Sequence, residues 1–192
     1  MKEMRIGEFT ARVPIIQGGM GVGISLAGLA SAVADYGGIG VIATAGIGMT
    51  QPDFFHSYIE ANTRALRQEI RKARAATSGI IGVNIMVALT NFAEMVRVSI
   101  EEGIDIIFSG AGLPFHLPQF RDKGTRTSLV PIVSSGRAAA LVCKRWTERF
   151  NFLPDALVVE GPMAGGHLGF HHEQIFNPMF ALEKLIPDVI EA

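Results

Sequence analysis

One acid and one histidine flank a glycine-rich segment near the end of the chain, and these residue types suit proton transfer beside a ligand. Glu160 closes an apolar run at 156–159, and His167 follows the glycine pair Gly165 and Gly166. Glycine lets the backbone approach a ligand closely, and histidine exchanges a proton near neutral pH. The pattern predicts an active-site loop, and the alternative is an ordinary connection from a strand to a helix.

The elements that must position this loop follow a repeating pattern. Short apolar runs stop at glycine or small polar residues and alternate with helical stretches, which indicates parallel βα units. The predicted strands cover residues 13–17, 40–43, 80–85, 104–108, 129–133 and 156–160. The predicted helices cover residues 25–36, 51–76, 91–102, 116–121, 137–150 and 178–190. We therefore expect six βα units in one domain that spans residues 1–192.

Two α/β architectures accommodate six such units: a doubly wound sheet and part of an eight-stranded barrel. A dinucleotide-binding fold would carry Gly-x-Gly-x-x-Gly after its first strand, but the run from Gly19 has Ile24 where the third glycine belongs. Polar or glycine-rich tips instead follow nearly every predicted strand. A ligand ringed by strand ends is typical of a barrel. We predict a TIM (β/α)8-type barrel that stops after six units.

Local signals set the expected helix ends. Ser25 and Asn91 are predicted to cap the helices that follow them, and Gly37 and Gly103 are predicted to end those helices. The basic stretch at 64–74 indicates a solvated helix face, and we assign it no function.

Composition excludes several classes of protein. Hydrophobic residues make up 48 % and charged residues 18 % of the 192 residues, which is enough to build a large core. The net charge is −1 and no dense basic block exists, so a nucleic-acid surface is not expected. Cys143 is the single cysteine, so no intrachain disulfide can form. Neither a signal peptide nor a membrane-spanning run is predicted, and we expect a cytoplasmic protein without a membrane partner.

A group of histidines near the glycine-rich segment raises the question of a metal site. His167 and His171 are four residues apart, and His172 and Glu173 follow directly. Such spacing places two ligands on one face only in a helix, and the neighbouring glycines disfavour a helix here. We predict no metal site.

Five motifs in order resemble the nitronate monooxygenase (2-nitropropane dioxygenase) family, which also contains the flavin-dependent enoyl-acyl-carrier-protein reductases. They are Pro14-Ile-Ile-Gln-Gly-Gly-Met-Gly21, Gly37-Gly-Ile-Gly-Val-Ile42, Gly82-Val-Asn-Ile85, Gly110-Ala-Gly-Leu-Pro114 and Glu160-Gly-Pro-Met-Ala-Gly-Gly-His-Leu-Gly169. The resemblance implies an FMN-binding TIM barrel in which the flavin lies across the carboxyl ends of the strands. Barrels of this family exceed 300 residues, which implies a fragment or truncated product that lacks the last two βα units.

The resemblance also assigns roles by position. The backbone at Gly19 and Met20 would face the isoalloxazine ring, and Asn84 would hydrogen-bond the flavin. Glu160 would hold the ribityl hydroxyls. The glycine pair at 165–166 would approach the phosphate, and the histidine that follows it, His167, would be the catalytic residue.

The implied activity is FMN-dependent oxidation of alkyl nitronates with O2, which releases a carbonyl compound and nitrite. Glu160 is a departure that favours the alternative, reduction of an enoyl thioester with NAD(P)H as the electron donor, and Met163 replaces the commoner acidic residue or serine. A third reading is an inactive remnant or assembly partner without cofactor. The expected partner is a small-molecule substrate, and a homo-oligomer is left open.

Overall fold

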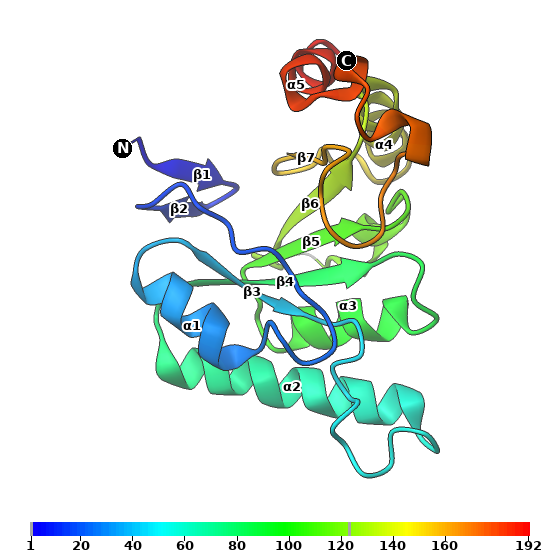
Figure 1. The fold of residues 1–192 in the computed structure, drawn as a ribbon. Helices are drawn as coiled ribbons and strands as arrows, with labels where there is room; N and C mark the ends of the chain where they lie inside the picture. Colours follow the sequence, from blue (N-terminus) through cyan, green and yellow to red (C-terminus); the bar gives the residue numbers. More distant parts are fainter. Residues whose placement is uncertain (1, 123) are drawn as a thin grey trace.

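Five parallel strands form one sheet, and each strand lies beside the one that precedes it in the chain (Figure 1). The computed structural model describes residues 2–122 and 124–192. The strands are β3 (Ile39–Ala43), β4 (Ile80–Met86), β5 (Ile106–Gly110), β6 (Ser128–Val133) and β7 (Val158–Val159). A doubly wound sheet would reverse its strand order at one point, whereas this order runs in a single direction. The chain is therefore an α/β half-barrel, which confirms the predicted fold class.

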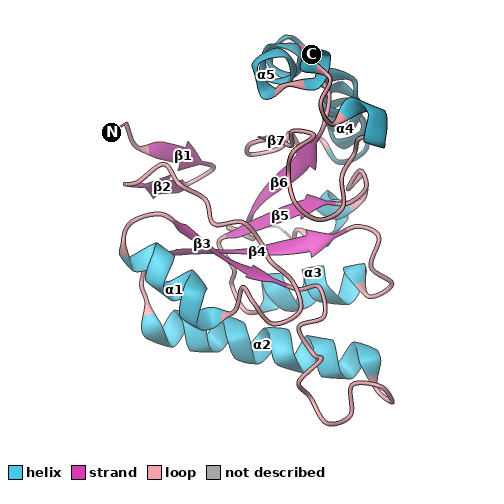
Figure 2. Cartoon of the chain, in the orientation of Figure 1, coloured by secondary structure: helices cyan, strands magenta, loops and turns pink. Residues whose placement is uncertain are grey.

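Helices follow the strands and cover the outer face of the sheet, with α1 to α3 side by side beneath it and α4 and α5 near β7 (Figure 2). They are α1 (Ala27–Asp35), α2 (Tyr58–Ala76), α3 (Phe92–Glu101), α4 (Gly136–Phe150) and α5 (Leu182–Glu191). Three short 3-10 helices are η1 (Leu117–Phe120), η2 (His172–Gln174) and η3 (Pro178–Phe180). Because each helix follows a strand, its amino end lies at the carboxyl edge of the sheet, where a ligand would bind.

The two faces of the sheet bury separate apolar clusters. The outer face packs on the helices through residues such as Ile42, Ile81 and Ile107. The inner face carries Val41 and Phe108, among others, and residues of the hairpin formed by β1 (Met4–Ile6) and β2 (Phe9–Ala11) join this inner cluster. Strands buried on both faces explain why their sequences are continuously apolar.

Two aspartates, located before β5 and β7, bind the amino ends of β4 and β6, respectively, with the same pair of hydrogen bonds. Asp105 donates its N–H to the Ile81 carbonyl (3.1 Å) and accepts the Ile81 N–H at Oδ2 (2.8 Å). Asp155 donates to the Leu129 carbonyl (3.1 Å) and accepts the Leu129 N–H at Oδ2 (2.8 Å). We call these pairs the aspartate clamps. They satisfy backbone groups at the edge of the sheet opposite to the carboxyl ends.

The basic stretch on α2 has the exposed residues Arg64, Arg71 and Lys72, as expected for a solvated face, and its arginines also dock this helix onto α3. Arg67 pairs with Glu101 (2.8 Å) and Glu102, and Arg71 binds Glu102 through Nε (2.7 Å). Hydrogen bonds from Arg71 and Arg67 lower the pKa of Glu102, whose side chain is only 10 % exposed. Arg74 likewise reaches Asp105 (2.8 Å), which links the helix to one aspartate clamp.

The predicted strands required four corrections. Residues 13–17 form no regular strand but lie parallel to β3 through one bridge between Ile16 and Ile39, and the Ile15 N–H donates to the Val13 carbonyl (2.8 Å) instead of to β3. The β1–β2 hairpin was missed, because three-residue strands carry almost no pattern. Strand β5 begins two residues later than predicted, and β7 has two residues instead of five. The sheet therefore contains five regular strands, where six were expected.

Two of the predicted helix caps were wrong. Leu26, not Ser25, occupies the position before α1, and Asn91 precedes α3 without a side-chain hydrogen bond to it. The predicted ends are confirmed, because Gly37 (φ +90°) and Gly103 (φ +68°) adopt the left-handed conformation that glycine tolerates.

Candidate active site

Gly19 and Asn84 meet at the carboxyl edge of the sheet. A Cβ atom at position 19 would lie 2.5 Å from the Asn84 Cβ and 3.2 Å from its Oδ1. Asn84 lies two residues after Gly82, whose own missing Cβ would meet the Phe108 ring, so both positions face the inside of the half-barrel. The structure thus brings together two residues for which the family resemblance implied contact with a flavin.

The Ser25 hydroxyl organises the loop that carries Gly19 and Met20. It accepts hydrogen bonds from the Met20 N–H (3.0 Å) and the Gln17 side-chain amide (3.0 Å), and it donates to the Gly18 carbonyl (3.2 Å). Gln17 also bonds the Val41 carbonyl (2.9 Å) of β3. Ser25 is fully buried, and its role as a loop anchor explains why it does not cap α1. Met20 remains 48 % exposed at the rim.

Val22, in the same loop, has a strained backbone. Its φ of +49° lies in the left-handed region, which a β-branched residue rarely adopts. The Val22 N–H donates to the Ala45 carbonyl (2.8 Å), and a Cβ on Gly21 would lie 2.9 Å from the same oxygen. The loops after the first two predicted strands are therefore fixed to one another. Backbone strain of this kind is concentrated at functional sites.

Glu160 and His167 line one pocket of about 390 Å³ at the far side of the same edge. The loop after β5 supplies Ala111 (φ +52°) and Gly112 to its wall, and β6 leads into it through Ser134. The pocket combines a carboxylate, a hydroxyl and an imidazole, which are groups that accept, donate and exchange protons.

The chain returns to Glu160 after the glycine-rich loop. The Gly169 N–H donates to Glu160 Oε2 (3.3 Å), and a Cβ at position 169 would lie 2.5 Å from the Ser134 Oγ. Residues 161–168 thus form a closed loop, with exposed His167 just before the point of closure. Gly165 and Gly166 are exposed in this loop, and a Cβ at either position would meet nothing within 4 Å.

Two helix amino ends at this edge already hold carboxylates. The Glu69 Oε2 accepts the Ala27 N–H of α1 (3.0 Å), and the Asp188 Oδ2 accepts the Gly136 N–H of α4 (2.7 Å). Helix amino ends are ordinary phosphate-binding sites, so an anion at either one would have to displace a carboxylate.

The structure places the predicted site residues in two groups. Gly19, Met20 and Asn84 lie at the β3–β4 side of the edge, and Glu160 and His167 share the pocket beyond β6. Sequence reasoning missed the contributions of Ser25 and Ser134. Ser134 begins a polar tip after a strand, which was the signal that could have found it.

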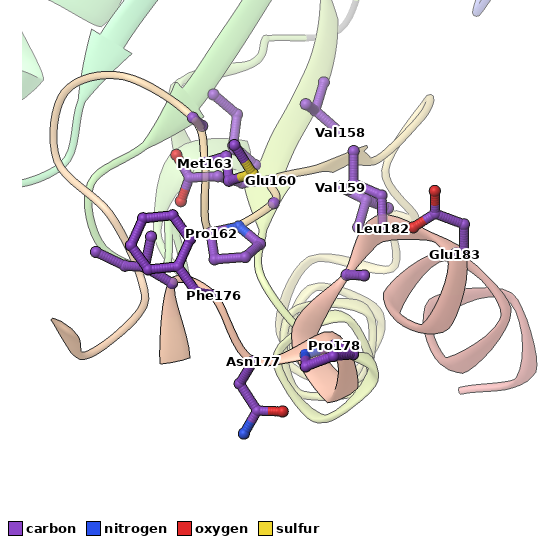
Figure 3. Close-up of a pocket in the computed structure, with 15 residues that line it drawn as sticks. Val158, Val159, Glu160, Pro162, Met163, Phe176, Asn177, Pro178, Leu182 and Glu183 are labelled. Carbon is purple, nitrogen blue, oxygen red and sulfur yellow. The ribbon is translucent and has the colours of Figure 1, made fainter. Parts of the chain in front are cut away.

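A larger, apolar pocket of about 770 Å³ surrounds the free side of β7 (Figure 3). Val158 and Val159 both line it, although consecutive strand residues point to opposite faces. The pocket therefore wraps around the edge of the sheet. Met163, Phe176 and Leu182 form much of its wall, and Glu160 lies between it and the smaller pocket.

Two kinds of feature are absent from residues 2–122 and 124–192. No group of three or more His, Cys, Asp or Glu side chains is arranged to hold a metal ion in this part of the chain. None of its helices is long and apolar enough to cross a membrane.

The order of the strands and the groups at their carboxyl ends define an α/β half-barrel protein with a candidate active site at that edge. The chain belongs to the nitronate monooxygenase family, because the family model described as "Nitronate monooxygenase" matches residues 2–192. This confirms the family that the five motifs indicated.

Solved structures show the same fold. FabK from Thermotoga maritima aligns with a TM-score of 0.68 and 28 % identity, over 94 % of this chain and 48 % of that one. Nitroalkane oxidase from Streptomyces ansochromogenes aligns with a TM-score of 0.71 over 94 % of this chain and 56 % of that one. Its identity is 19 %, so this likeness concerns the fold alone.

A curated relative comes from Mycobacterium tuberculosis (strain ATCC 25618 / H37Rv). It is named "(3aS,4S,5R,7aS)-5-hydroxy-7a-methyl-1-oxo-octahydro-1H-indene-4-carboxyl-CoA dehydrogenase" and is 28 % identical over 179 residues, which are 93 % of this chain and 41 % of the relative. The chain therefore spans about half the length of the proteins that it matches.

Proposed function

We propose that the chain provides the flavin-binding edge and the proton carrier of an FMN-dependent oxidoreductase that oxidises alkyl nitronates. One observation carries the proposal: residues from the family motifs lie in two groups along the same carboxyl edge of the parallel sheet. Gly19 contacts Asn84 there, and Glu160 lines a pocket together with His167. The match to the nitronate monooxygenase family supports the same conclusion.

The residues at this edge fit a flavin in two respects. The backbone at Gly165 and Gly166 is open on the side where other residues carry a Cβ, so a phosphate could approach its N–H groups. The Asn84 amide is half-buried beside a glycine, which leaves its polar atoms uncovered by a side chain at position 19. Because carboxylates occupy the amino ends of α1 and α4, the glycine pair is the better candidate for the phosphate.

FMN, when bound, would supply the electron transfer itself. The protein would then need to orient the substrate and carry a proton. In this proposal His167 Nδ1 or Nε2 accepts the proton from the carbon next to the nitro group of a neutral nitroalkane. A nitronate that enters as the anion needs no such step. Glu160 and Ser134 would position groups in the same pocket.

A second candidate is the reduction of an enoyl thioester. The M. tuberculosis relative is named for a carboxyl-CoA substrate, and FabK is an enoyl-ACP reductase; both are 28 % identical to this chain. In that reaction His167 would donate a proton to the substrate carbon instead of accepting one. NAD(P)H would be the electron donor.

Visible spectroscopy of the purified 192-residue protein tests these proposals. We expect added FMN to remain with the protein through gel filtration and to show a protein-induced shift of its absorption bands. Nitronate-dependent O2 consumption would support the first candidate. Rapid anaerobic bleaching by NADH or NADPH, with turnover of a crotonyl thioester, would support the second. Protein that fails to retain FMN at micromolar concentration would contradict both and favour a chain without cofactor.

A further inference from the structure

The closure of the glycine-rich loop has a specific steric basis. The space that a Cβ at position 169 would fill is already occupied by the Ser134 side chain, with Oγ at 2.5 Å and Cβ at 3.0 Å. Gly169 has no positive φ, so its backbone conformation alone would permit alanine. Glycine is needed at position 169 because of the contact with Ser134.

A hydrogen bond reinforces this contact. Glu160 Oε2 accepts the Gly169 N–H (3.3 Å), and the Glu160 N–H donates to the Val133 carbonyl (2.8 Å) of β6. Both ends of residues 161–168 are thereby tied to the carboxyl ends of β6 and β7. His167 lies two residues before Gly169, so its position along the pocket depends on this closure.

We propose that Ser134 and Glu160 are positioning residues that hold His167 in place through their contacts with Gly169. This inference rests on the proposed function only in assigning His167 a role in proton transfer. The closure itself is a property of the flavin-free protein, so it can be tested without catalysis.

The chain offers a matched control in the same loop. Gly165 and Gly169 are each two residues from His167, and neither has a positive φ. A methyl group added at Gly165 meets nothing within 4 Å, whereas one added at Gly169 collides with Ser134. Gly165→Ala and Gly169→Ala therefore change the same chemistry at equal sequence distance and differ in the collision alone.

The first measurement is the 1H–15N NMR spectrum of the histidine rings in the flavin-free 192-residue protein, with the His167 signal assigned by its loss in His167→Ala. We expect Gly169→Ala to shift or broaden this signal and Gly165→Ala to leave it in place. Ser134→Ala combined with Gly169→Ala should restore it partly, because the Ser134 Cβ contact remains. Ser134→Gly combined with Gly169→Ala should restore it fully.

The second measurement is turnover with FMN. Displacement of a reacting group by about 1 Å lowers rates by up to roughly 10²-fold. We expect Gly169→Ala to lower kcat with little change in KM. The inference would be overturned by a His167 signal that does not move in Gly169→Ala, or by an equal shift in Gly165→Ala. It would also be overturned if the signal does not recover in the Ser134→Gly and Gly169→Ala double variant while the unfolding midpoint is unchanged. Absence of turnover in the parent would contradict the proposed function, and the NMR comparison would still decide the role of Ser134.

Discussion

Gly19 and Asn84 pack so closely that a methyl group on residue 19 would overlap the asparagine side chain, with 2.5 Å between the two Cβ atoms. The contact joins the loop after the first predicted strand to the carboxyl end of β4. Gly18, the adjacent residue, has open space at the equivalent point. The steric requirement for glycine therefore applies to position 19 and not to position 18.

Gly19→Ala should lower FMN affinity, because the added methyl group must push the Asn84 side chain away from its present position. Overpacking of this kind costs about 1–3 kcal/mol. Asn84→Ala should lower the affinity by a similar amount through loss of a hydrogen-bonding group. Fluorescence titration with FMN measures both effects, and Gly18→Ala is the matched control. Equal affinities for Gly18→Ala and Gly19→Ala would separate Asn84 from the flavin.

His167→Ala should leave FMN affinity unchanged and lower turnover of a neutral nitroalkane by about 10²- to 10⁴-fold, which is the usual contribution of a general acid or base. Pre-ionised nitronate should be affected much less, since its carbon is already deprotonated. Steady-state kinetics with both forms of one compound tests this expectation. An equal loss for the two forms would assign His167 to binding.

Asp155→Ala should destabilise the fold by about 1–3 kcal/mol, because the Leu129 N–H loses its acceptor at a buried strand end. Asp155→Asn keeps an acceptor oxygen and should cost less. Urea unfolding measures the difference, and FMN affinity is the internal control because the clamp lies at the opposite edge from the site. Identical stability of the two variants would show that the clamp contributes little.

Glu102→Gln should lower the stability at neutral pH by about 1 kcal/mol, as expected for an ion pair at a partly exposed site. The pKa of Glu102 is lowered from 4.5 in the folded protein, so its contribution is complete above that value and is lost as the pH falls through the folded pKa. Unfolding free energies measured between pH 7 and about pH 3 should therefore converge for parent and variant. A constant difference across this range would contradict the assignment.

The free side of β7 should make the 192-residue chain self-associate. An unpaired strand edge beside exposed apolar side chains is a template for pairing with another chain. Phe176, 84 % exposed in the pocket around β7, contributes to this surface. Sedimentation velocity should show less association for Phe176→Asp than for Phe55→Asp, a control that is 89 % exposed in the loop before α2. A monomeric parent would contradict this expectation.

The apolar strands were predictable because burial on both faces leaves a continuous hydrophobic run. Strands β3, β4 and β6 lie within two residues of their predicted bounds. The 13–17 segment forms no regular strand because the Ile15 N–H donates to the Val13 carbonyl within the segment (2.8 Å), which takes this N–H out of the ladder with β3. A local hydrogen bond of this kind leaves no periodic signal in the sequence.

The site residues were recognisable by type and motif, whereas their partners were not. The acceptor at the amino end of α1 is Glu69, 42 residues away, so Ser25 was assigned a cap that another residue provides. The contact between Ser134 and Gly169 joins two loops that are 35 residues apart in the chain. Such contacts depend on how strands are arranged in space, and a linear pattern does not encode them.

The aspartate clamps have a consequence for laboratory evolution of this protein. Asp105 and Asp155 fasten one rim of the sheet, whereas Asn84, near the carboxyl end of β4, and the loop that carries His167 lie at the other. Substitutions at the two rims share no contacts, and effects on stability at sites without shared partners tend to add. A library that randomises the loops could therefore start from a parent whose clamped rim has first been strengthened, so that more of its members remain folded.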